Sequence, residues 1–159
     1  MNYPVTPAIR VLRQREIEFE PRVFEYIERG GTKHSAAVLR VDEHAIIKTL
    51  VFETNERKPF IVLMHGDLHV SAKELARVLN LKSVAPVAPE KANKLTGYLI
   101  GGTSPFGTKT KMSVYVERTI FDLPRIYING GKRGFLIAVE PRVLREVLPI
   151  EVVEVGIKV

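Results

Sequence analysis

Short runs of alternating or uninterrupted apolar residues along the chain predict more strands than helices. Seven segments rich in valine, isoleucine, phenylalanine and tyrosine are expected to form strands: residues 18–27, 45–52, 59–64, 113–117, 125–128, 135–139 and 151–159. The second and third segments are separated only by a short polar stretch, so they are expected to pair as a hairpin.

Helix signals lie between some of these strands. Thr6 followed by Pro7 predicts a cap and a first turn for a helix that extends to about residue 15. Ser71 and Glu74 have the spacing of a capping box at the start of a helix over residues 71–79. Shorter helices are expected over residues 35–39, after Pro89 and over residues 141–148.

The order of these elements restricts the fold class. Strands outnumber helices and do not alternate strictly with them, which argues against a doubly wound parallel sheet. The predicted fold is α/β in the broad sense (α+β), with a mixed, largely antiparallel, barrel-like sheet flanked by helices. Because the 159 residues contain no repeat, low-complexity tract or linker, residues 1–159 are expected to form a single domain.

Composition narrows the classes of function. Lysine and arginine number 24 against 18 acidic residues, and the net charge of +6 suits a polyanion such as RNA as well as it suits an ordinary basic protein. The absence of cysteine excludes disulfides, zinc–thiolate sites and a cysteine nucleophile in this chain. No apolar run is long enough to cross a bilayer and residues 1–9 do not resemble a signal peptide, so a cytoplasmic location without membrane association is expected.

Lys48 interrupts the apolar, β-branched segment over residues 46–52. A lysine in such a strand most often lies on the hydrated face or extends to the rim of the sheet. Alternatively it lines a pocket, where its ammonium group is available to a phosphate or a carbonyl oxygen. The strand pattern leaves both interpretations open.

The densest loop signal is Gly-Gly-Thr-Ser-Pro-Phe-Gly over residues 101–107. Three glycines free the backbone and one proline fixes part of it, so several N–H groups can point at one spot and hold a carbonyl oxygen as it becomes an oxyanion. A long ordinary turn is the alternative. The loop does not match a Walker motif, because the Gly-Lys-Ser/Thr ending is missing.

Two further segments are typical of turns. Residues 129–130, Asn-Gly, favour a type I′ hairpin turn, whose tip would project Lys132 and Arg133 into solvent or onto a phosphate backbone. His65 and His69 have a ligand spacing for a helix, but the glycine and aspartate between them indicate a loop, so no metal site is expected. A strong protein nucleophile is not indicated either.

Three segments, read in order, closely resemble the YbaK family of aminoacyl-tRNA editing proteins. They are Ile-Lys-Thr-Leu over residues 47–50, Thr-Gly-Tyr-Leu-Ile-Gly-Gly-Thr-Ser-Pro-Phe-Gly over 96–107 and Ile-Tyr-Ile-Asn-Gly-Gly-Lys-Arg-Gly over 126–134. Residues 6–8 and the helix over 73–79 match as well, so the resemblance covers nearly the whole chain. It implies the fold of the editing domain found within bacterial prolyl-tRNA synthetases, a mischarged tRNA as partner, and no cofactor or metal.

The resemblance also implies roles for particular residues. Lys48 is expected to hold the phosphate end of the terminal adenosine, and the backbone of residues 101–105 to hold the aminoacyl carbonyl. The residues implied to be catalytic are Lys48, Gly101 and Gly102. Those implied to bind substrate are Phe24, Thr49, Thr103, Ser104, Pro105, Asn129, Gly130 and Gly131. Those implied to contact tRNA are Lys132 and Arg133.

The implied reaction fits a chain without a nucleophile. An aminoacyl ester is already reactive, so positioning and oxyanion stabilisation can supply much of the rate. The most similar branch resembles the Cys-tRNA(Pro) deacylases, in which the substrate's own thiol attacks its carbonyl and releases a thiolactone, and the 2′-hydroxyl of the tRNA end can assist.

Three positions depart from that branch. Asn129 stands where a serine is common, Leu136 where an acidic residue is common, and Phe24 where a tyrosine is common. The amino acid removed is therefore left open, with alanine on tRNA(Pro) as the alternative to cysteine. A non-catalytic tRNA-binding module is the second alternative, and prolyl-tRNA synthetase is the expected protein partner.

Overall fold

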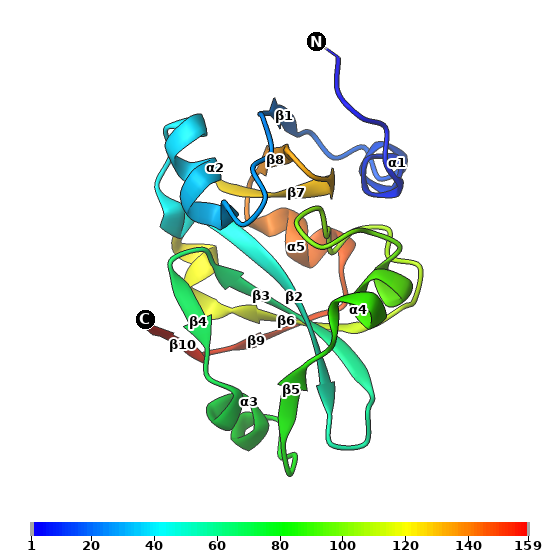
Figure 1. Ribbon diagram of the computed structural model, residues 1–159, viewed down its shortest axis with the longest axis vertical. Coiled ribbons are helices and arrows are strands. Elements are labelled where there is room, and N and C mark those ends of the chain that lie inside the picture. The colour runs from blue at the N-terminus through cyan, green and yellow to red at the C-terminus, as the bar shows by residue number, and fades with distance from the viewer. Residues whose placement is uncertain (1, 159) are drawn as a thin grey trace.

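A mixed sheet of eight strands forms the centre of the computed structural model, which describes residues 2–158. Seven strands follow the order β1-β8-β7-β2-β3-β6-β9, and β5 pairs with β2 (Figure 1). A smaller sheet pairs β10 with β4. The strands are β1 (Glu20–Val23), β2 (Ile46–Thr54), β3 (Pro59–His65), β4 (Leu68–Val70), β5 (Val84–Pro86), β6 (Ser113–Glu117), β7 (Ile126–Lys132), β8 (Phe135–Val139), β9 (Ile150–Val153) and β10 (Gly156–Lys158).

The pairing directions confirm the predicted fold class. β2 pairs with β7 in parallel, and so do β3 with β6 and β6 with β9, whereas the other pairs are antiparallel. β2 and β3 form the predicted hairpin, in register from Ile47 opposite His65 to Glu53 opposite Pro59. The sheet is therefore mixed and mostly antiparallel, and helices flank it (Figure 1).

The described residues form five helices. The first and third begin at their predicted caps, whereas the second begins at Gly31, four residues before the expected start at residue 35. The helices are α1 (Pro7–Gln14), α2 (Gly31–Leu39), α3 (Ala72–Val78), α4 (Pro89–Thr96) and α5 (Arg142–Val147), with short 3₁₀ turns η1 (Glu43–Ala45) and η2 (Arg118–Asp122). The Thr6 side chain accepts from the N–H of Ile9, and the Ser71 side chain accepts from the N–H of Glu74. The capping box is only half formed, because the Glu74 carboxylate pairs with Arg77. None of the described helices is long and apolar enough to span a membrane.

Alternate side chains of β2 enter two different cores. Ile47 and Val51 belong to the main core, which also holds Ile9 and Leu12 of α1. Phe52, on the other face of the strand, packs in a second core with Leu75 of α3. This period of two places Lys48 on the same side of β2 as Phe52, near the end of the strand that adjoins α2.

The structure differs from the sequence-based expectations at three places. The strand expected over residues 18–27 is limited to Glu20–Val23, and the other two differences are at the C-terminus and at one hairpin. The last segment forms two strands, β9 and β10, because the Glu117 carboxylate accepts from the N–H groups of Val155 and Gly156 and holds the chain in a bend. Val159 lies outside the described residues. The tip of the β7–β8 hairpin is not residues 129–130: Lys132 pairs with Phe135, which makes residues 133–134 the turn. Residues 129–131 instead form an irregularity in β7.

Candidate active site

A cleft of about 490 Å³ opens between α2, the segment that follows β1, strand β2 and the loop after α4. Seven of the residues singled out from the sequence line it: Phe24, Lys48, Thr49, Gly101, Thr103, Asn129 and Arg133. The remaining lining includes apolar groups such as Ile46 and Leu136. Five separate segments of the chain thus converge on one concave site, which is the usual form of a small-molecule or cofactor pocket.

Lys48 is half-buried and lines this cleft, so of the two positions that the strand pattern left open it occupies the pocket. Its Nζ donates to the carbonyl oxygen of Leu68 at 2.5 Å. Burial lowers the pKa of Lys48, because the charged form loses hydration, and the nearby carboxylates of Glu43 and Asp67 oppose that effect. The site therefore presents a lysine whose remaining N–H groups can meet an anionic or carbonyl oxygen.

Thr49, the neighbour of Lys48, lines the same cleft. Its hydroxyl oxygen is buried and has no hydrogen-bond partner among the described residues. A buried polar group without a partner is uncommon in proteins and is destabilising. A ligand in the cleft could complete its hydrogen bonding once the protein atoms that cover the hydroxyl shift.

The loop that begins at Gly101 is fastened to the β7–β8 hairpin. The Asn129 amide Nδ2 donates to the Gly101 carbonyl at 3.1 Å, and Arg133 Nε donates to the Ile100 carbonyl at 2.8 Å. Gly101 itself has φ 90°, and a Cβ there would lie 2.8 Å from the Tyr26 hydroxyl oxygen. The positive φ and the close Tyr26 hydroxyl both exclude a side chain at this position, which explains why residue 101 is glycine.

Asn129 joins the two segments. While its Nδ2 contacts the Gly101 loop, its Oδ1 accepts from the N–H groups of Gly131 at 2.6 Å and Lys132 at 3.0 Å. The Asn129 side chain therefore fixes both the irregularity in β7 and the start of the Gly101 loop.

Six of the predicted site residues do not line the cleft. They are Gly102, Ser104, Pro105, Gly130, Gly131 and Lys132. Gly102 is buried against the hairpin, where a Cβ would lie 2.7 Å from the Arg133 nitrogen, and its N–H donates to the Leu99 carbonyl. Ser104 is fully buried, and its hydroxyl accepts from the N–H of Phe106. Gly102 therefore contributes to the packing of the loop against the hairpin instead of lining the cleft.

Sequence reasoning missed other residues of the cleft. Tyr26, half-buried, lines it, and the Arg133 guanidinium lies 5.2 Å from the centre of the Tyr26 ring. Thr32 and His34 line it from α2. The only signal for Tyr26 is its place two residues after Phe24 in an alternating segment, and α2 carries no motif.

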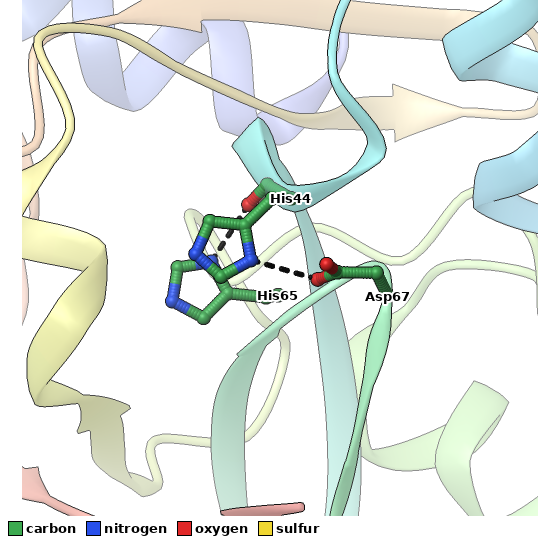
Figure 2. A group of neighbouring side chains, drawn as sticks. All are labelled: His44, His65 and Asp67. Carbon is green, nitrogen blue, oxygen red and sulfur yellow. Dashed lines mark hydrogen bonds and ion pairs between the residues drawn. The ribbon is translucent and has the colours of Figure 1, made fainter. Parts of the chain in front are cut away.

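His44 of η1, His65 at the end of β3 and Asp67 of the β3–β4 turn form a cluster (Figure 2). The two imidazole rings are stacked, with centroids 3.6 Å apart and planes within 5°. A ring nitrogen binds a metal in the plane of its ring, so two parallel stacked rings cannot share an ion. Both His65 nitrogens are also occupied, Nδ1 by the His44 carbonyl and Nε2 by the Thr119 hydroxyl. As drawn, the cluster is a hydrogen-bonded network.

Comparison with known proteins identifies the class of this site. A family model described as "Aminoacyl-tRNA editing domain" matches residues 31–147, which include the cleft residues of α2, β2, the Gly101 loop and the β7–β8 hairpin. The chain belongs to the aminoacyl-tRNA editing family, of the YbaK type, and its activity is aminoacyl-tRNA deacylation. The resemblance stated from the sequence is thereby confirmed.

Sequence identity to individual relatives is below 30% for the two compared below. A protein of Enterococcus faecalis, provisionally named Cys-tRNA(Pro)/Cys-tRNA(Cys) deacylase EbsC, is 28% identical over 140 residues, which cover 87% of this chain and 85% of that protein. A proline–tRNA ligase of Streptococcus thermophilus is 26% identical over 140 residues, but these are only 21% of its length.

Solved structures show the same fold. The hypothetical protein APE2540 superimposes with a TM-score of 0.87 at 22% identity, over 96% of this chain and 100% of that one. A structure provisionally described as a trans-editing enzyme for prolyl-tRNA synthetase superimposes with a TM-score of 0.81 at 20% identity, over 97% of this chain and 99% of that one.

Proposed function

We propose that this protein removes cysteine from mischarged Cys-tRNA(Pro), acting in trans as a single domain over residues 1–159. The observation that carries the proposal is the meeting of Lys48 and the Gly101 loop in one cleft. The similarity to a protein named as a Cys-tRNA(Pro) deacylase supports cysteine as the substrate.

In the proposed complex, Lys48 binds the phosphate end of the terminal adenosine, and the N–H groups of Gly101 and Thr103 face the ester carbonyl. Gly102 is a poorer donor than the sequence suggests, because its N–H already donates to the Leu99 carbonyl. The unpartnered hydroxyl of Thr49 gains a hydrogen-bond partner from the substrate. Donors held in place before the reaction stabilise the developing oxyanion without further rearrangement.

The bond changes come from the substrate itself. The cysteine thiol sulfur attacks the ester carbonyl carbon, the bond to the terminal ribose oxygen breaks, and the thiol proton passes to that oxygen directly or through the neighbouring ribose hydroxyl. The products are a cysteine thiolactone and the free tRNA end. No protein nucleophile is required, since the cleft supplies position and hydrogen bonds.

Alanine is the second candidate substrate, favoured by the apolar side of the cleft. Leu136 is buried there in place of the acidic residue common in the cysteine branch, and Ile46 lies beside it. An apolar wall of this kind suits a methyl group as well as a thiol. Alanine lacks a thiol, so its removal would proceed by attack of water on the ester carbonyl. The bond to the terminal ribose oxygen breaks, the proton of the water passes to that oxygen directly or through the neighbouring ribose hydroxyl, and free alanine leaves.

The proposed function also implies a cellular location and a protein partner. We propose that the protein works in the cytoplasm on tRNA released by prolyl-tRNA synthetase. Matching segments lie within proline–tRNA ligases, which indicates that the same fold operates beside that synthetase in other proteins.

A panel of mischarged tRNAs tests the proposal. Purified protein is incubated with Cys-tRNA(Pro), Ala-tRNA(Pro), Pro-tRNA(Pro) and Cys-tRNA(Cys), and the release of each amino acid is followed under single-turnover conditions. Cys-tRNA(Pro) is expected to be cleaved fastest and Pro-tRNA(Pro) to be spared. Faster cleavage of Ala-tRNA(Pro) would transfer the assignment to alanine, and cleavage of none, with tRNA binding retained, would contradict both and favour a binding module.

A further inference from the structure

The ammonium group of Lys48 is hydrogen-bonded to the chain segment where the turn between β3 and β4 ends. Its Nζ donates to the carbonyl of Leu68, the first residue of β4. The preceding residue, Asp67, supplies one of the two carboxylates, with Glu43, that raise the pKa of Lys48 against burial. Both the direction of the lysine and its charge therefore depend on where residues 66–68 lie.

Leu68 pairs with Lys158 of β10, and three contacts hold the two residues before it, Gly66 and Asp67. The Gly66 N–H donates to the Ile46 carbonyl of β2 at 2.6 Å, and the Thr32 hydroxyl of α2 lies 3.1 Å from the Gly66 carbonyl. The third contact joins His44 Nδ1 to Asp67 Oδ1 at 2.8 Å (Figure 2). Only this last one acts on the residue directly before Leu68.

His44 is itself held in place. Its ring stacks on His65, and its carbonyl accepts from His65 Nδ1 at 2.7 Å. The opposite nitrogen of His65, Nε2, accepts from the Thr119 hydroxyl at 2.7 Å. Burial lowers the pKa of His65 and so favours its neutral form, and the fully buried ring presents a flat surface on which His44 stacks. The chain of contacts therefore runs from Thr119 through His65, His44 and Asp67 to Leu68.

We propose that His44 and Asp67 are positioning residues for Lys48. They hold the turn whose Leu68 carbonyl directs the ammonium group into the cleft, and neither of the two lines the cleft itself. The inference rests on the proposed function of Lys48. It assigns to the histidine cluster, whose rings are stacked and hydrogen-bonded, a role in orienting the active site.

Breaking the contact from either side gives the primary test. His44→Phe keeps a flat ring on His65 but removes the donor to Asp67, and Asp67→Ala removes the acceptor. Each is expected to slow single-turnover deacylation by about threefold to thirtyfold, the range of coupling between contacting residues. His44→Asn, whose amide nitrogen can replace Nδ1, is expected to retain most of the wild-type rate. If one variant fails to fold, the other still breaks the same contact.

The matched control is His69→Gln. His69 is an exposed histidine on the same short strand, β4, and lies opposite Ile157 of β10. This variant is expected to keep the wild-type rate and melting temperature. Thermal melts of all variants separate loss of activity from loss of the fold.

A double-mutant cycle with Lys48→Ala decides whether the two residues act through the lysine. If they do, His44→Phe and Asp67→Ala cause no further loss in the Lys48→Ala background. An equal loss in both backgrounds would overturn the positioning role, and so would wild-type rates for both single variants while Lys48→Ala is slow. A wild-type rate for Lys48→Ala would instead remove the proposed function itself.

Discussion

Lys48 carries a charge on a strand whose neighbouring side chains are buried. Ile46 and Ile47 are almost completely buried, whereas Lys48 reaches the cleft and is held by the Leu68 carbonyl. A charge is costly in such surroundings unless it is paired or hydrogen-bonded. The Leu68 carbonyl offsets part of this cost, and the proposed contact with the adenosine end of the tRNA would give the remaining N–H groups a partner.

Thr49 provides a test at the scale of one atom. Thr49→Val removes the buried hydroxyl that has no partner while keeping the β-branched shape. We expect the free energy of unfolding to stay the same or rise by about 1 kcal/mol, because an unsatisfied polar group is lost. We expect deacylation to slow about tenfold, because a charge-free hydrogen bond to the substrate is lost. Melts and single-turnover rates measure the two effects; a destabilised variant with a normal rate would refute this role.

His65 makes a prediction about pH. Burial holds its pKa below the ordinary value of 6.5. Below that pH the unfolded chain binds a proton that the folded chain does not, so the free energy of unfolding decreases as pH falls toward the folded pKa. The melting temperature is expected to drop between about pH 7 and pH 5, and less steeply in His65→Gln. Parallel slopes for the two proteins would show that His65 does not contribute.

At the scale of elements, the longer strands and the capped helices follow from the sequence, because their apolar periodicity and cap residues are local signals. β4 and β5 have three residues each, too few to show a period, and they form because β10 and β2 offer edges to pair with. The β7–β8 turn shifts from the Asn-Gly pair because the Asn129 side chain binds the backbone of Gly131 and Lys132.

For the site, too, the sequence predicts what local signals encode and does not predict contacts made by tertiary packing. Lys48 and the Gly101 loop are predictable, because each breaks a local pattern. The pairing of His44 with Asp67 is not predictable, since the two are distant in the sequence and meet only when η1 packs beside the β3–β4 turn. Tyr26 and the residues of α2 likewise reach the cleft through packing alone.

Contact between the loop and the hairpin can be tested at Gly102. A Cβ there would lie 2.7 Å from the Arg133 nitrogen and 2.8 Å from the Lys132 carbonyl carbon, both backbone atoms. Gly102→Ala is therefore expected to push the loop away from the hairpin and slow deacylation at least about tenfold, since small displacements of positioning groups are costly. The rate is compared with that of wild type at a temperature where melts show both proteins folded. An unchanged rate would mean that the loop need not lie against the hairpin.

At the scale of the whole molecule, the net charge of +6 and a tRNA substrate predict affinity that falls with salt. Lys132 and Arg133 are both exposed. Arg133 lines the cleft and is directed by the Ile100 carbonyl and the Tyr26 ring. Lys132 carries no such restraint from the loop, so it is the better candidate for a phosphate contact.

Lys132→Ala is expected to weaken tRNA binding and to reduce the slope of log affinity against log salt by about one. The control is Lys58→Ala, an exposed lysine just before β3, on the hairpin that lies at the opposite end of the molecule from β7 (Figure 1). Titrations at several salt concentrations measure both slopes. A flat salt dependence of the wild type, or equal slopes for the two variants, would argue against a phosphate contact at Lys132.

The central claim is that Lys48 positions the aminoacyl end of the tRNA in this cleft. The most direct test compares wild type with Lys48→Ala in single-turnover release of cysteine from Cys-tRNA(Pro), with thermal melts recorded alongside. A lost hydrogen bond to a charged group, with the resulting misplacement of the ester, predicts a fall of about tenfold to over a hundredfold at similar stability. Equal rates at matched stability would contradict the account and leave Lys48 as a solvated strand lysine.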